Sequence, residues 1–245
     1  MKSKIIAHRG MSTLAPENTL SAFELMPQYK INWLETDLAI TKDEQLVIMH
    51  DNNLSRTTNG KGSLTNVTLK ELRNFSAGSW FSNKFQKEKV PTFDELVSFL
   101  NQTKINLNLE IKYVIGKNAH QLTDSMIKQL ALKIDAIDPS IRVIISSFYP
   151  EILLKLKKLR PNLEYACLFN QWTFPFWKPI TKLIGTNIIH PYTQGLNQRK
   201  IKQLKAAGFE VNVWTVDYFQ RAMQLSKWGV DGIFTDIGQQ FHVKQ

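Results

Sequence analysis

A buried β-strand is predicted for the run Trp33-Leu34-Glu35-Thr36-Asp37-Leu38-Ala39-Ile40, which is short and mostly apolar. Similar short runs recur along the chain, and segments with helical periodicity separate them. This alternation predicts a parallel sheet with crossover helices. The predicted strands are Lys4 to His8, Trp33 to Ile40, Asn106 to Ile111, Ile141 to Ser146, Glu164 to Leu168, Asn187 to Ile189, Glu210 to Thr215 and Gly232 to Thr235.

Eight strands that each lead into a helix favour an α/β fold of the (β/α)8 TIM barrel type. The 245 residues of the chain suit a single barrel domain, residues 1–245. An open doubly wound sheet is less favoured, because the first turn, His8-Arg9-Gly10-Met11, lacks the glycine pattern of dinucleotide-binding folds. The predicted helices are Leu20 to Tyr29 after the cap Thr19, Phe93 to Leu100 after Thr92, and Arg199 to Ala207 after Asn197, with Gly208 and Gly229 as helix ends.

One segment, Asp51 to Val90, is too long for an ordinary strand-to-helix loop. It follows an extra extended run, Leu46 to Met49, and is rich in Asn, Thr, Ser, Gly and Lys. A turn is predicted at Asn59-Gly60-Lys61-Gly62 and a short helix from Leu69 to Phe75. We therefore predict a small insertion after the second barrel strand, at about residues 51–90, which would be placed to cap the barrel mouth.

Composition narrows the class of protein further. No window approaches the roughly 20 uninterrupted apolar residues of a membrane span, and Met1 to Lys4 leads directly into a strand-like run rather than into the apolar region of a signal peptide. The single cysteine, Cys167, lies in an apolar run and is predicted to be a core residue. These features predict a cytoplasmic protein, whose net charge of +10 would attract nucleic acid, an acidic membrane surface or a phosphate-bearing substrate.

Two carboxylates stand two residues apart in the second predicted strand. Glu35 and Asp37 would therefore project to the same face, where their repulsion and lost hydration call for a compensating partner such as a hard divalent cation. Ion pairs with Lys or Arg at a solvated strand end are the alternative. Glu110 and Lys112 repeat the spacing at the end of another strand, so Glu110 either completes a three-carboxylate site or forms a simple ion pair with Lys112.

Histidine and arginine residues supply further candidates. His8 and His50 each end an apolar run and are placed to exchange protons at the barrel mouth, although a single histidine is more often a hydrogen-bonded structural residue. The structural role is predicted for His120 and His242, and the role of His190 is left open. The guanidinium of Arg9 suits a phosphate oxygen pair, or else an ion pair with Glu17.

These residues belong to an ordered set of motifs that covers nearly the whole chain. The set is His8-Arg9-Gly10, Pro16-Glu17-Asn18-Thr19, Glu35-Thr36-Asp37, His50-Asp51 with Leu54-Ser55-Arg56-Thr57-Thr58, Pro91-Thr92-Phe93-Asp94-Glu95-Leu96, Glu110-Ile111-Lys112, Ser146-Ser147-Phe148, Val213-Trp214-Thr215-Val216 and Gly229-Val230-Asp231-Gly232-Ile233-Phe234-Thr235-Asp236. It resembles the glycerophosphodiester phosphodiesterase family. Two positions depart from the family pattern, because Ile237 and Gln45 stand where the family often has proline, and neither is a candidate site residue.

The resemblance implies a (β/α)8 barrel with a small inserted segment after the second strand. It also implies a divalent cation, Mg²⁺ or Ca²⁺, held by Glu35, Asp37 and Glu110. The implied substrate is a small-molecule glycerophosphodiester such as glycerophosphocholine, cleaved to glycerol phosphate and an alcohol.

Roles for the remaining candidates are implied in the same way. His8 and His50 would be the acid/base pair, and Arg9 and Lys112 would hold the phosphate. Trp214 would line the glycerol or alcohol side of the site, with a core aromatic as the alternative.

Two other functions have some support in the sequence. A lysophospholipase D or sphingomyelinase D-like lyase would share the fold and the site but accept a lipid, and the charge of +10 and the aromatic residues from Trp172 to Trp177 favour peripheral membrane contact. A non-catalytic polyanion-binding protein would use the lysines of Glu151 to Arg160 and of Lys200 to Lys205. Nucleic acid is not an expected partner, because no nucleic-acid motif or ladder of stacking aromatics is present.

Overall fold

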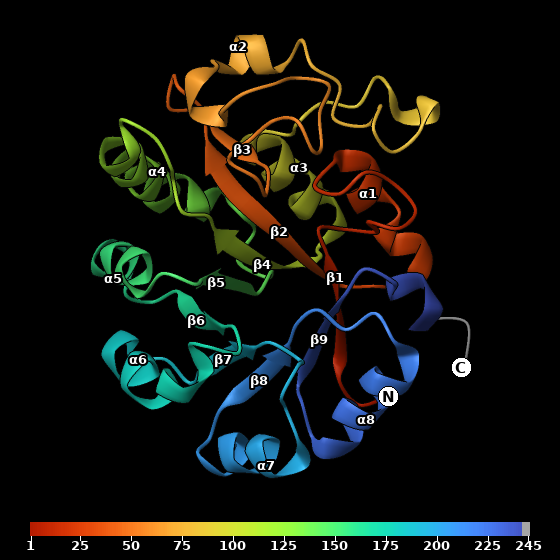
Figure 1. Ribbon diagram of the computed structural model, residues 1–245, viewed down its shortest axis with the longest axis vertical. Helices are drawn as coiled ribbons and strands as arrows, with labels where there is room; N and C mark the ends of the chain where they lie inside the picture. Colours follow the sequence, from red (N-terminus) through yellow and green to blue (C-terminus); the bar gives the residue numbers. More distant parts are fainter. Residues whose placement is uncertain (242–245) are drawn as a thin grey trace.

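The strands form one sheet that closes on itself (Figure 1). The computed structural model describes residues 1–241. Eight strands run parallel around the ring, which closes because β1 pairs with both β2 and β9. They are β1 (Lys4–His8), β2 (Trp33–Ile40), β4 (Asn106–Ile111), β5 (Val143–Ser147), β6 (Glu164–Phe169), β7 (Ile188–Pro191), β8 (Glu210–Val213) and β9 (Gly232–Thr235). The predicted (β/α)8 barrel is confirmed.

Four strands, β1, β2, β4 and β9, have the predicted bounds, and the others differ by one or two residues at an end. One error of two residues lies at the end of β8, which was predicted to reach Thr215 but stops at Val213. Trp214 leaves the regular ladder there, and its carbonyl accepts a hydrogen bond from the amide of Thr193 in the segment after β7. At the start of β5, Ile141 is instead part of a turn, because its amide donates to the carbonyl of Asp138.

Helices surround the barrel on the outside (Figure 1). They are α1 (Leu20–Glu24), α3 (Phe93–Thr103), α4 (Ala119–Lys133), α5 (Pro150–Leu159), α6 (Trp177–Ile184), α7 (Gln198–Ala206) and α8 (Phe219–Trp228). The predicted cap Thr92 forms a capping box with Glu95. The predicted helix from Leu20 to Tyr29 is wrong in its second half, which is a 3₁₀ turn, because Pro27 has no backbone N–H for a helical hydrogen bond.

Apolar side chains fill two layers. Inside the barrel, side chains from six strands pack together, namely Ile6, Trp33, Ile144, Ala166, Ile188 and Phe234. The larger layer lies between the strands and the helices, as expected for a parallel sheet buried on both faces. Cys167 belongs to this outer layer, and burial raises the pKa of its thiol to about 12, so the prediction of a core cysteine is confirmed.

The predicted insertion is present and has a small core of its own. It begins after β3 (Leu46–Ile48), which pairs antiparallel with β2, and it contains one short α-helix, α2 (Leu69–Leu72), that ends earlier than predicted. Its core is made by Ala39, Val47, Met49, Leu54, Leu64, Leu72, Ala77 and Val90. Figure 1 shows the insertion beyond the end of β2, on the side of the barrel away from β7 and β8. It therefore borders one side of the mouth.

Two leucines of α4 test how strongly the outer layer stabilises the fold. Leu130 is fully buried, whereas Leu132 is 81% exposed. We expect Leu130→Ala to lower the free energy of unfolding by about 2–5 kcal/mol, because it leaves a cavity in the core. The matched control Leu132→Ala should change it by less than about 0.5 kcal/mol. Urea denaturation measures both, and equal effects would mean that this face of α4 does not pack as described.

Candidate active site

The register of the strands brings three carboxylates of β2 and β4 together, beside the carboxyl ends of β1 and β4. Asp37 lies beside Glu110 across the β2–β4 pair, and Glu35 is two residues before Asp37 on the same face. Each of the three side chains offers an oxygen within 4.8 Å of the others, and all three residues are buried. They are therefore not at a solvated strand end, which was the alternative for Glu35 and Asp37.

The pKa values of Glu35 and Asp37 are shifted in opposite directions. Burial, and after it the charge of Asp37, raises the pKa of Glu35 to about 8. Burial alone would also raise the pKa of Asp37, but the charges of Lys112 and Arg9 outweigh it and hold that pKa below its usual value. The two neighbouring carboxylates therefore differ in proton affinity, as expected when like charges share a buried site.

The oxygens of Asp37 indicate whether the cluster suits a cation. Its Oδ2 accepts a hydrogen bond of 2.8 Å from the side-chain amide of Asn18. Its Oδ1 is buried and accepts no hydrogen bond from the described residues, with the Nζ of Lys112 3.6 Å away. A buried carboxylate oxygen without a donor, next to two further carboxylates, is the arrangement that a hard divalent cation satisfies. The residues present therefore fit a Mg²⁺ or Ca²⁺ ion.

Both cations predicted to hold phosphate lie beside this cluster. The Nζ of Lys112 is 2.7 Å from Glu110, which is the simple ion pair considered for these two residues. Arg9 donates to Glu17 at 2.7 Å, and its Nε lies 3.3 Å from Asp37 and has no hydrogen-bond partner among the described residues. The alternative ion pairs therefore exist, but they lie next to the carboxylate cluster rather than away from it.

The turn after β1 holds Arg9 in place. Arg9 has a φ of +58° and Gly10 a φ of +81°, in the left-handed region. A Cβ atom on Gly10 would lie 2.8 Å from the ring of Phe23, so glycine is required there for space as well as for φ. The turn also directs the amide of Arg9 to Glu35, whose side-chain Oε2 accepts it at 3.0 Å.

Each of the two candidate histidines is oriented by a carboxylate. The Nδ1 of His8 lies 2.7 Å from Asp236 and its Nε2 3.9 Å from Glu35, and the Nδ1 of His50 lies 2.5 Å from Asp51. Burial alone would lower the pKa of His8, but the charge of Glu35 and the hydrogen bond to Asp236 raise it. A carboxylate on Nδ1 fixes the ring and its tautomer, and leaves Nε2 as the nitrogen that can exchange a proton.

The histidines face one cavity of about 100 Å³ at the barrel mouth. Arg9, Glu35 and Glu110 also line it, as do the aromatic side chains of Phe148 and Trp214. Trp214 donates from its Nε1 to the carbonyl of His190 at 2.7 Å, so its ring is held as one wall of this cavity.

A chain of ion pairs connects His50 to the carboxylate cluster, and the sequence did not predict it. Asp51 bonds His50 and also accepts from Arg56 at 2.6 Å, and Arg56 donates to both oxygens of Glu17 at 2.7 and 2.8 Å. Glu17 in turn pairs with Arg9, which lies against Asp37. Arg56 comes from the insertion, so the insertion contributes directly to the electrostatics of the mouth.

Three further residues at the site were missed. Asp236 follows the last strand, and the closure of the barrel places it beside His8. Asn18, with a φ of +56°, bonds Asp37, and no periodic pattern signals such a residue. Asn108 lines the cavity with a buried, unpaired Oδ1, and its position two residues before Glu110 on β4 was a signal that could have found it.

The other two histidines of the described residues do not reach the mouth. His190 is fully buried inside the barrel, where its Nε2 lies 3.1 Å from the side-chain amide of Asn212, and burial lowers its pKa to about 3. The exposed His120 lies 3.4 Å from Asp124 one helical turn away, in agreement with a structural role. His242 lies outside the described residues.

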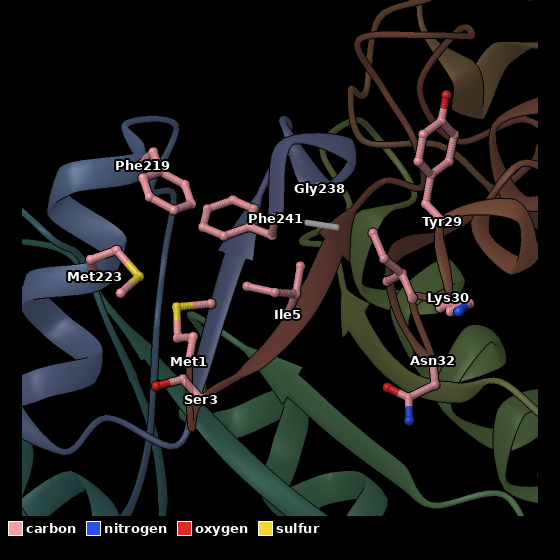
Figure 2. A pocket seen from close by; sticks show the side chains of 11 residues that line it. Met1, Ser3, Ile5, Tyr29, Lys30, Asn32, Phe219, Met223, Gly238 and Phe241 are labelled. Carbon is pink, nitrogen blue, oxygen red and sulfur yellow. The ribbon is translucent and has the colours of Figure 1, made fainter. Parts of the chain in front are cut away.

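A larger cavity of about 260 Å³ lies elsewhere, outside the barrel and beside the start of β1. Figure 2 shows Phe219 and Phe241 side by side within it, with Tyr29 on the opposite side. The residues that line it include no carboxylate and no histidine, so size alone does not identify the site. Among the described residues, no helix combines the length and the apolar character needed to cross a membrane.

The pKa of Glu35 predicts how a cation should act on stability. Without a cation, protonated Glu35 stabilises the fold at low pH, and this contribution is lost as the pH rises through about 8. A cation competes with that proton, so we expect the rise in Tm caused by Mg²⁺ or Ca²⁺, relative to EDTA, to be larger at about pH 9 than at about pH 6. Thermal melting measures it. The control Glu35→Gln should lose the pH dependence, and a larger rise at low pH would contradict the assignment.

Comparison with known proteins places this geometry in a family. The Glycerophosphoryl diester phosphodiesterase family matches residues 8–237 of the chain. A glycerophosphodiester phosphodiesterase of Caldanaerobacter subterraneus is 34% identical over 96% of this chain and 95% of its own, and one of Bacillus subtilis is 31% identical over 97% and 84%.

A solved structure is similar over almost its whole length. It is a phosphodiesterase of Oleispira antarctica in complex with the product sn-glycerol-3-phosphate, with a TM-score of 0.90 and 30% identity over 97% of this chain and 94% of that one. On these grounds, the chain belongs to the glycerophosphoryl diester phosphodiesterase family.

Proposed function

We propose that the protein hydrolyses glycerophosphodiesters to glycerol 3-phosphate and an alcohol, with a divalent cation as cofactor and two histidines as acid and base. The class of enzyme, a phosphoric diester hydrolase, follows from the family. The observation that carries the proposal is a cavity lined by two carboxylate-oriented histidines and by Glu35 and Glu110 of the buried three-carboxylate cluster. The product bound by the Oleispira antarctica phosphodiesterase supports the substrate class.

In this proposal Glu35, Asp37 and Glu110 hold the cation, which would be Mg²⁺ or Ca²⁺ because three carboxylates suit either. A bound cation would neutralise negative charge on the phosphodiester. Arg9 and Lys112 add positive charge on the same side of the cavity and would hold the phosphate oxygens. Trp214 would line the side that takes the glycerol or alcohol group.

The histidines carry the proton transfers. One of them removes the proton from the nucleophile, which is water or the glycerol hydroxyl of the substrate, as the new P–O bond forms. The other donates a proton to the alkoxide as the old P–O bond breaks. Asp236 and Asp51 favour this exchange, because each stabilises the positive charge that its histidine gains. If the glycerol hydroxyl attacks, water must open the cyclic ester in a second step.

A lysolipid substrate is the second candidate, and the exposed aromatic side chains near the mouth favour it. Trp172 is 76% exposed and Phe176 60% exposed, both in the segment after β6. Turnover on lysophosphatidylcholine above that on glycerophosphocholine would favour this candidate. A cytoplasmic location stays a prediction from the sequence.

Release of glycerol phosphate from glycerophosphocholine tests the proposed function. We expect turnover with Mg²⁺ or Ca²⁺ and loss of turnover in EDTA that either ion restores, because the cluster needs a cation to offset its charge. Full turnover in a strong chelator would contradict the role of the cation. Binding of DNA or acidic liposomes without any turnover would favour the polyanion-binding alternative.

Replacement of the histidines tests their role. We expect His8→Ala and His50→Ala each to lower kcat by about 10²–10⁴-fold, since each removes a proton-transfer group. Replacement of His120, which is 85% exposed at its side chain, should leave kcat unchanged. The Tm rise caused by the cation should persist in all three variants. Loss of that rise in a histidine variant would instead make the histidine a cation ligand.

A further inference from the structure

The segments that follow β4, β5, β6 and β7 share an unusual composition. Residues 112–118, 148–149, 170–176 and 192–197 contain no aspartate or glutamate and together hold seven aromatic residues. Because the strands are parallel, all four segments lie at the carboxyl ends of the barrel strands, around the mouth of the candidate site. These four segments therefore contribute no acidic side chain to the side of the mouth that they form.

Exposed aromatic residues of the described chain gather on the mouth side. Five lie in segments between the carboxyl end of a barrel strand and the next α-helix: Tyr113, Tyr149, Trp172, Phe176 and Tyr218. The sixth, Trp80, belongs to the insertion. Toward the opposite end the exposed large apolar residues of the helices are aliphatic, namely Leu132, Leu159 and Leu183. Aromatic exposure is thus a property of one face.

Cations stand among these aromatics without acidic partners. Lys117, Lys178 and Arg199 are exposed and form no ion pair with a described residue. Lys178 and Arg199 each occupy the second position of a helix whose first turn contains no acid. A cation at a helix start is repelled by the positive end of the helix dipole, so an anionic partner would be needed to offset that cost. Glu151, an exposed acid on this face, lies in the first turn of α5.

We propose that this aromatic and cationic rim docks the barrel mouth on an anionic lipid surface. Amphipathic aromatic rings suit the boundary between headgroups and acyl chains, and unpaired Lys and Arg beside them suit negatively charged headgroups. The proposal goes beyond the proposed function, because it names a surface that is separate from the catalytic cavity and can be measured without turnover.

The aromatics favour lipid over nucleic acid. Tyr113 and Tyr149 stack on each other, with ring centroids 4.5 Å apart and an angle of 27° between the planes, so their facing surfaces are already in use. Phe174 and Trp177 pack edge-on against Phe169 and Phe209. Base recognition needs free ring faces along a groove. The exposed side chains of Trp172 and Phe176 suit partial insertion among headgroups instead.

The charge of the rim is tested with two matched triple variants. The mouth variant removes three cations from the rim through Lys117→Gln, Lys178→Gln and Arg199→Gln. The control variant removes three exposed cations from the last turns of α5, α6 and α8, at the other end of the barrel, through Lys158→Gln, Lys182→Gln and Lys227→Gln. Binding to vesicles of phosphatidylglycerol is measured by cosedimentation at low salt. The mouth variant should lose on the order of 100-fold in affinity, about fivefold for each cation, and the control less than about fivefold.

The role of the exposed aromatic side chains is tested with a double variant, Trp172→Ala with Phe176→Ala. The matched control is Leu159→Ala with Leu183→Ala, which removes two exposed aliphatic side chains at the opposite end. Only the first pair should weaken vesicle binding, while both should keep turnover on soluble glycerophosphocholine. Equal losses in the mouth and control variants would overturn the proposal. It would also be overturned by equal affinity for phosphatidylcholine vesicles, or by binding of DNA without binding of vesicles. None of these results would affect the proposed function, which is measured by turnover on a soluble substrate.

Discussion

The arrangement at the barrel mouth depends on the repulsion among Glu35, Asp37 and Glu110, three carboxylates whose oxygens lie within 4.8 Å of one another in a buried position. Burial of like charges is costly unless opposite charges and hydrogen bonds compensate. The fold supplies part of this compensation through Arg9 and Lys112. It does not supply all of it, since no residue in the described part of the chain donates to one oxygen of Asp37, and this incomplete compensation makes the cluster suited to a cation.

The same constraint extends outward from the cluster. Arg9 can lie against Asp37 only because the left-handed turn after β1 directs it there, and Glu17 then holds its guanidinium from the other side. Glu17 also holds Arg56 from the insertion, and Arg56 holds the aspartate that orients His50. Alternating charges thus join residues far apart in the sequence, so the insertion is part of the site as well as a neighbour of the barrel.

The sequence predicted the elements that depend on local patterns. Strand β2 was predicted because its aliphatic run is short, and its two carboxylates were placed on one face because side chains alternate along a strand. Residues whose partners come from distant segments could not be predicted in this way. Asp236 meets His8 only because β9 pairs with β1, and Arg56 meets Glu17 through an irregular loop with no periodicity to follow. Strand ends such as that of β8 were also uncertain, because hydrogen bonds from neighbouring loops decide them.

The two ends of the barrel use the same residue types for different purposes. At the amino-terminal end, Lys4 and Arg142 both pair with Glu210 and lie over the ring of Trp33, and Arg142 also pairs with Glu164, so each of these charges has a partner. His190, inside the barrel, has its pKa lowered to about 3 by burial, whereas His8 has its pKa raised by the carboxylates at the mouth. Residue type alone therefore does not mark a catalytic group. A charged side chain becomes available for chemistry where the barrel leaves its compensation incomplete and a cavity gives access to it.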